Sequence, residues 1–115
     1  MTSFAVAVPI LPGKTEEWRR FIAEVTGPRR SETEEYHRRF GFTKANWFLQ
    51  QTPRGDIAII YVEGNDPEYS FQKWRESDHL YDLWFKQQLG PFYGLDFNQP
   101  FPGTPPKQLF EWQAR

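Results

Sequence analysis

The sequence predicts an α+β domain whose elements follow the order βαββαβ. Three observations lead to this prediction. Four short segments alternate apolar and polar residues with the period of a strand, two longer segments repeat apolar residues with the period of a helix, and turn residues separate them. A length of 115 residues suits one domain, residues 1–115, built around a single core.

The first strand and the first helix lie at residues 4–10 and 15–26. Bulky apolar residues occupy every second position of the strand, which leaves its other side nearly bare with alanine and proline. Within the helix, apolar residues recur at the i, i+3, i+4 and i+7 spacing of one buried stripe. Gly27–Pro28 interrupts the helix, and a capping box at Ser31–Glu34 predicts a second helical piece over residues 32–40.

A β-hairpin and a second helix follow. Strands at residues 44–52 and 57–63 are separated only by the Pro53–Asp56 turn, so we expect them to pair antiparallel. Asp66, followed directly by proline, is a strong start for a helix that runs to residue 90.

Residues 91–106 are rich in proline but also aromatic, which is unusual for a flexible linker. We expect an irregular segment that forms a lid, a dimer arm or a plain loop. Its rings are Phe92, Tyr93, Phe97 and Phe101. Residues 107–114 alternate again and predict a fourth strand.

This order is the ferredoxin-like arrangement, a four-stranded antiparallel sheet with two helices on one face. The helices leave the other face uncovered, yet the third strand is apolar on both sides, with Ile57, Ile59 and Tyr61 on one of them. A second copy of the chain is the simplest cover. The sequence therefore predicts a homodimer that packs sheet to sheet.

Three stretches carry a resemblance to known proteins: Glu35–Arg39, Trp47–Gln50 ahead of Thr52–Asp56, and Ser77–His79 with Asp82–Lys86. With the order of elements from Phe4 to Ala114, they resemble the dimeric α/β-barrel superfamily, and within it a bacterial family of uncharacterised domains. The resemblance implies two sheets paired into a barrel, with pockets between sheet and helices. Because the superfamily includes monooxygenases, haem-degrading enzymes, isomerases and ligand binders, it implies no particular activity.

Composition excludes several classes of function. Fourteen basic residues balance 15 acidic ones, so no net field favours nucleic acid or an anionic membrane surface as a partner. The absence of cysteine excludes disulfides and thiolate chemistry. No apolar run is long enough to span a bilayer, and the start of the sequence does not read as a signal peptide, so we expect a cytoplasmic protein.

Four residues are candidates for acid–base catalysis: His79, His37, Glu63 and Tyr61. Histidine titrates near neutral pH, and a carboxylate among rings would have a raised pKa. The structural alternatives are that the histidines lie at the surface and that Glu63 simply ends a strand in solvent.

Six residues are candidates for ligand binding, because aromatic rings and a few polar groups form typical pocket walls. They are Trp47, Tyr61, Trp74, Asp78, Tyr81 and Arg39. Asp78 has alternative interpretations as a cap of a restarted helix or a member of a buried ion pair. No metal site is predicted from Asp78, His79 and Asp82, and no cofactor is expected. The first strand also lacks the asparagine of the haem-degrading branch.

Two functions remain open at this point. The first is a homodimeric domain that binds a small apolar or aromatic molecule between its sheet and helices. The alternative is a cofactor-independent, monooxygenase- or isomerase-like enzyme in which a His, Glu or Tyr side chain moves a proton.

Overall fold

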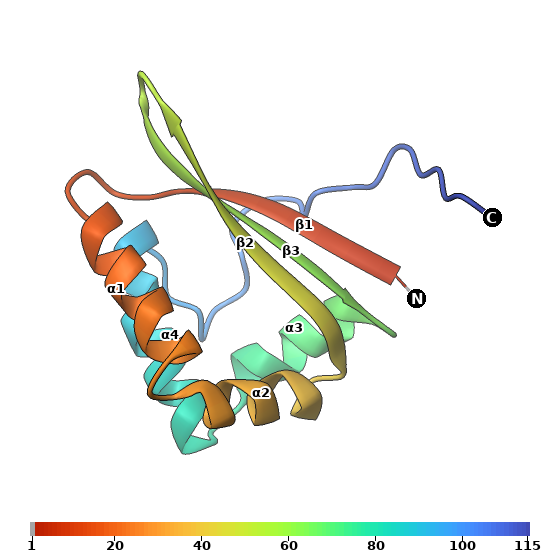
Figure 1. Ribbon diagram of the computed structural model, residues 1–115, viewed down its shortest axis with the longest axis horizontal. Helices are drawn as coiled ribbons and strands as arrows, with labels where there is room; N and C mark the ends of the chain where they lie inside the picture. Colours follow the sequence, from red (N-terminus) through yellow and green to blue (C-terminus); the bar gives the residue numbers. More distant parts are fainter. Residues whose placement is uncertain (1) are drawn as a thin grey trace.

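A computed structural model describes residues 2–115 as an α+β fold with three strands and four helices in that range (Figure 1). In chain order the elements are β1 (Thr2–Pro9), α1 (Thr15–Thr26), α2 (Arg30–Arg39), β2 (Phe42–Thr52), β3 (Gly55–Gly64), α3 (Pro67–Glu76) and α4 (Leu80–Tyr93). Across this range, no helix is long and apolar enough to cross a membrane.

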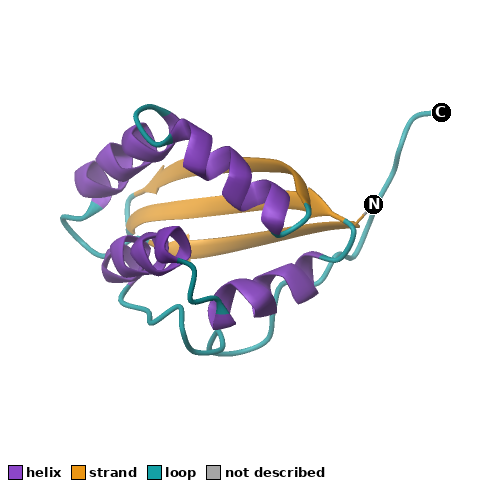
Figure 2. Ribbon diagram, turned by 90° about the horizontal axis from the view of Figure 1, so that it is seen from below, coloured by secondary structure: helices purple, strands orange, loops and turns teal. Residues whose placement is uncertain are grey.

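The strands form one antiparallel sheet in the order β1-β3-β2. Its register places Ala7 of β1 beside Ile59 of β3, and Ile59 beside Phe48 of β2. All four helices lie on the same side of this sheet (Figures 1 and 2). The sheet therefore has an inner face that packs on the helices and an outer face that no helix covers.

The prediction of a four-stranded ferredoxin-like sheet with two helices, paired into a barrel, is wrong. Residues 107–114 form no strand and are exposed to solvent, and the sheet has three strands among the described residues. Alternation in the sequence shows only that a segment suits an extended conformation. Pairing also needs a neighbouring strand in register, and this segment runs out beyond the body of the domain (Figure 1).

The predicted break after α1 is confirmed, but the helices begin and end at other residues than the sequence predicted. Arg30 already donates its backbone N–H to Gly27, and Thr33 donates to Arg29, so α2 starts before the Ser31 capping box. The second predicted helix is divided at residues 77–79 into α3 and α4. α4 continues past the predicted end at residue 90 to Tyr93, and Gly94 caps it with the left-handed φ of +69° favoured by glycine.

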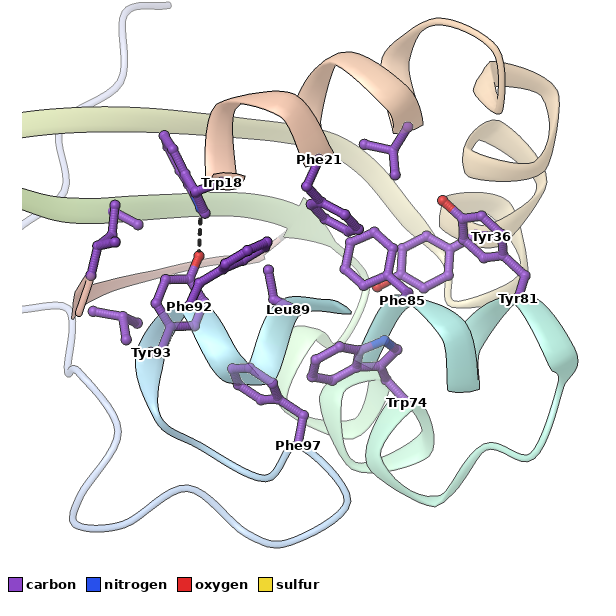
Figure 3. Packing of buried hydrophobic residues seen from close by; sticks show 14 residues of the cluster. Trp18, Phe21, Tyr36, Trp74, Tyr81, Phe85, Leu89, Phe92, Tyr93 and Phe97 are labelled. Carbon is purple, nitrogen blue, oxygen red and sulfur yellow. Dashed lines mark hydrogen bonds between the residues drawn. The ribbon is translucent and has the colours of Figure 1, made fainter. Parts of the chain in front are cut away.

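The core between the inner face and the helices consists mainly of aromatic rings (Figure 3). Phe85 of α4 lies at its centre: its ring centroid is 5.0 Å from that of Phe21 on α1 and 4.9 Å from that of Tyr36 on α2. Trp74 on α3 packs against the same ring at 6.3 Å. One side chain thus joins all four helices.

The outer face is apolar along its middle. We define it by Ala5, Ala7, Pro9, Phe48, Ile57 and Ile59, which alternate with the inward-facing residues of their strands. Phe48 of β2 is 54% exposed, and Ala5 and Ala7 of β1, on the other side of β3, are exposed as well. The expected apolar second face is therefore present, although the predicted fourth strand is not.

Candidate functional site

A small cavity lies between the inner face of the sheet and the helices, and we call it the inner cavity. Its volume is about 60 Å³, which is room for a few water-sized molecules. Its walls are almost entirely apolar and come from every element except α1: Phe4, Val6, Val8, Tyr36, His37, Phe42, Trp47, Ile60, Val62, Phe71, Trp74, Phe85, Leu89, Tyr93, Phe97 and Phe101.

Trp74 lines this cavity and carries a polar group that has no partner among the described residues. Its side chain is 96% buried, since only 4% of its surface is exposed, and the unpaired group is the indole Nε1–H. Buried tryptophans normally pair this group. Leaving it unpaired costs about 1–3 kcal/mol. The unpaired donor beside a cavity therefore indicates a place for an acceptor atom.

His37 supplies the second polar group. Its Nδ1 lies 2.8 Å from the backbone oxygen of Thr33, and because a carbonyl can only accept, Nδ1 carries the proton. Burial lowers the pKa of His37 below its usual 6.5, so the ring is neutral at pH 7. Its Nε2 then keeps a lone pair that can accept a hydrogen bond or take up a proton.

The phenols beside the cavity are uncharged and do not act as bases at neutral pH. Burial, reinforced by the charge of Asp82, raises the pKa of Tyr36 well above its usual value of 10.0. Burial also raises the pKa of Tyr93, and the indole of Trp18 donates to its hydroxyl at 2.8 Å (Figure 3). No full charge therefore comes from His37, Tyr36 or Tyr93.

A larger, more polar chamber lies outside the inner cavity, and we call it the outer chamber. It has a volume of about 430 Å³ between α3, β1 and residues 101–106, and Asp66, Glu68 and Arg75 are among its lining residues. The two spaces share the side chains of Phe4, Val6, Phe71 and Phe101. A single layer of side chains thus separates them.

Three of the predicted site residues line the inner cavity: His37, Trp47 and Trp74. Trp47 is mainly a packing residue, since its ring stacks on Trp18 at a centroid distance of 6.3 Å. Tyr81 lies just beyond the cavity, where its hydroxyl is 2.6 Å from the hydroxyl of Thr33. These residues come from α2, β2, α3 and α4.

The other candidates lie elsewhere. Tyr61 donates a short hydrogen bond to Glu63 on the outer side of the sheet, and this bond raises the pKa of Tyr61. His79 is exposed and caps α4 by accepting the backbone N–H of Tyr81 at 3.2 Å. Asp78 is exposed in the linker between α3 and α4. The four side chains therefore do not meet at the cavity.

Arg39 does not line the inner cavity; it lines a separate open pocket with residues of α3 and pairs with the buried Asp82. Its guanidinium donates to both carboxylate oxygens of Asp82 at 2.9 and 2.8 Å, and Ser77 donates to the same carboxylate at 2.5 Å. Burial alone would raise the pKa of Asp82, but the hydrogen bonds from Arg39 and Ser77 outweigh it and hold that pKa below its usual range. The buried acid of this region is thus Asp82, not Asp78.

Sequence reasoning missed two features of this region. Lys86 is 3% exposed, and its ammonium donates to the backbone oxygens of Arg75 and Ser77 at 3.0 Å each. The sequence signal that could have predicted the burial of Lys86 is its position three residues before Leu89, on the buried side of α4. The pairing of Trp18 with Tyr93 joins residues 75 positions apart, so no local signal predicts it. In the part of the chain that the structure describes, no three acidic or histidine side chains gather as a metal site.

Comparison with known proteins found no match to a family model, to a curated protein or to a solved structure. The resemblance to the dimeric α/β-barrel superfamily accordingly stays a prediction from the sequence.

Proposed function

We propose that this protein binds a small, uncharged, apolar or aromatic molecule in the inner cavity. The observation that carries the proposal is the Trp74 indole N–H, which is buried without a partner among apolar walls. A ligand oxygen that accepts this hydrogen bond would remove the cost of the unpaired donor. The neutral ring of His37 offers a complementary acceptor to a ligand hydroxyl.

The ligand is expected to be neutral, because the cavity offers a charged group no counterion. Transfer of an unpaired charge into such surroundings is strongly unfavourable. The inner cavity of about 60 Å³ is smaller than the ~150 Å³ in which an engineered protein cavity holds benzene. Entry of a ring therefore requires a wall residue to move, and Phe101, which also lines the outer chamber, lies in an irregular segment.

Phenol and toluene are matched probes for the hydrogen bond to Trp74, since they are similar in size and only phenol carries oxygen. We expect Trp74→Phe to lower the affinity for phenol relative to toluene at least fivefold, about 1 kcal/mol. Trp84→Phe is the control, because Trp84 does not line the inner cavity. Binding is followed by chemical-shift titration. An unchanged ratio in Trp74→Phe, or no binding of either probe, contradicts the proposal.

A second candidate function is proton transfer by a cofactor-independent, isomerase-like enzyme. The observation that favours it is His37, the one residue among His79, His37, Glu63 and Tyr61 that lines the inner cavity. A neutral imidazole there can take a proton from a carbon beside a carbonyl and return it to the same or another atom.

Deuterium exchange from solvent into 2-indanone tests this second function. We expect His37→Ala to lose at least tenfold in rate, and His79→Asn, which keeps a cap on α4, to lose none. Because the pKa of His37 lies below 6.5, the rate should be constant near pH 7 and fall as the pH drops through that pKa. Equal rates in both variants would leave ligand binding as the function.

A further inference from the structure

Residues 107–115, which we call the arm, expose large apolar side chains that do not line the inner cavity. Leu109, Phe110 and Trp112 are 89%, 81% and 76% exposed. Their neighbours are polar: Glu111 lies between Phe110 and Trp112. In an extended chain Phe110 and Trp112 point to one side, so the arm has an apolar side two rings long. Exposed apolar patches of this kind mark interaction surfaces.

The same chain also carries an uncovered apolar surface, the outer face. Ala7, Ile59 and Phe48 form one row across its three strands, and the alanines of β1 leave a low strip beside the larger isoleucines of β3. Large rings laid over small residues fill such a strip without overpacking. The arm and the outer face are therefore complementary in polarity and in the size of their side chains.

The arm does not cover the outer face of its own chain. Ser3, near the start of β1, donates its hydroxyl to the side chain of Gln108 at 3.1 Å, which places the beginning of the arm at that end of the sheet. From there the chain runs away from the body of the domain, past the start of β1 (Figures 1 and 2). Pro105 and Pro106 directly before the arm favour an extended chain over a reversal.

We propose that the arm of one copy packs on the outer face of a second copy, and that the second copy returns the same contact. Reciprocal exchange buries both surfaces in one closed, two-fold symmetric dimer. This proposal goes beyond the ligand site and does not depend on it.

The area of this contact suits a stable dimer. Phe110 and Trp112, which lie on the same side of the arm, each bury roughly 200 Å², so one arm and the strip beneath it bury about 800 Å² together. Two such contacts give about 1,600 Å², inside the range of specific interfaces. The net charge of −1 per chain adds little repulsion between two copies.

Native mass spectrometry and analytical ultracentrifugation test the role of the rings. We expect the wild type to be a dimer of 2 × 13.7 = 27.4 kDa. The double variant Phe110→Ser/Trp112→Ser and a deletion of residues 107–115 should both raise the dimer dissociation constant at least tenfold. Leu80→Ser is the matched control, since Leu80 is 84% exposed on α4, on the helical side of the sheet, and its dimer should persist.

Cross-linking tests where the arm lies. The chain has no cysteine, so the double variant Ala7→Cys/Ala114→Cys carries the only two thiols, one on the outer face and one on the ring side of the arm. A short bismaleimide should give a covalent dimer joined between positions 7 and 114. A monomeric wild type, a dimer that survives loss of the two rings, a link within one chain, or a link joining position 7 to position 7 would each overturn the proposal.

Discussion

At the scale of single residues, the most deeply buried acid among the described residues, Asp82, is the one that an arginine and a serine both bind. Asp82 has no exposed surface, and it accepts three hydrogen bonds, two of them from the guanidinium of Arg39. Such an ion pair contributes little more to stability than a well-packed apolar pair would, but removing one partner is costly because it leaves a buried charge unpaired. The ion pair thus makes the meeting of α2 and α4 sensitive to one substitution and to acid.

We expect Asp82→Asn to lower the free energy of unfolding by about 3 kcal/mol at pH 7, because Arg39 loses its counter-charge. The pKa of Asp82 is lower in the folded than in the unfolded chain, so its contribution is present above pH ~4 and is lost as the pH falls through the folded pKa. Urea unfolding at pH 7 and at pH 3 measures both effects.

Glu35→Gln is the control for this prediction. Glu35 accepts from the same Arg39 at 3.1 Å, but its side chain is 61% exposed, and exposed pairs contribute little. If Glu35→Gln lowered the free energy of unfolding as much as Asp82→Asn does, the burial of Asp82 would not be what makes its ion pair with Arg39 important for stability.

At the scale of elements, the sequence predicted what local chemistry decides. The hairpin formed by β2 and β3 follows from its turn residues. Asp66 caps the start of α3, where its carboxylate accepts the backbone N–H of Tyr69 at 3.2 Å. The start of α2 was predicted less well, because backbone hydrogen bonds through Gly27 begin the helix before the capping residues are reached. Tertiary context thus overrode a good local signal.

The end of α3 depends on a residue of the next helix, and this makes a testable prediction. Lys86 donates to the carbonyls of Arg75 and Ser77, which the helix itself leaves without partners. We expect Lys86→Met, similar in length and apolar, to lower the free energy of unfolding by about 2 kcal/mol, because two partly buried acceptors lose their donor. Thermal unfolding followed by circular dichroism checks this.

Lys73→Met serves as the comparison, since Lys73 lies on the exposed side of α3. Its unfolding free energy should stay within about 0.5 kcal/mol of the wild type. If Lys86→Met were equally harmless, the ammonium would not be needed to end α3.

At the scale of the whole molecule, the candidate site could be predicted only in part. Aromatic residues at strand and helix positions indicated a pocket between sheet and helices, and His37, Trp47 and Trp74 do line one. Which polar atoms of the pocket lack partners depends on distances between elements remote in sequence. The same limit applies to the sheet, since alternation over residues 107–114 indicates an extended segment but not what it pairs with.

Residues 95–106 border both spaces of the site, and substitutions of two of their phenylalanines should have different effects. Phe97 is 5% exposed and packs on Trp74 at 5.3 Å, so we expect Phe97→Ala to cost about 3–4 kcal/mol of unfolding free energy. Phe101 is only partly buried and lines both spaces. Phe101→Ala should cost about half as much and speed phenol association, as measured by line-shape analysis. An unchanged association rate would mean that ligands enter elsewhere.

The placement of the five tryptophans gives the molecule two optical signals that need no added dye. Trp18 and Trp74 are buried, and Trp47 and Trp84 pack on the same ring cluster, so their emission should be blue-shifted and shielded from iodide. Trp112 is 76% exposed in the single chain, so its emission should be red-shifted and readily quenched in the monomer, and shielded when the arm packs on a second copy. Intrinsic fluorescence can therefore report on the core and on the arm separately, at two emission wavelengths, in one unlabelled sample.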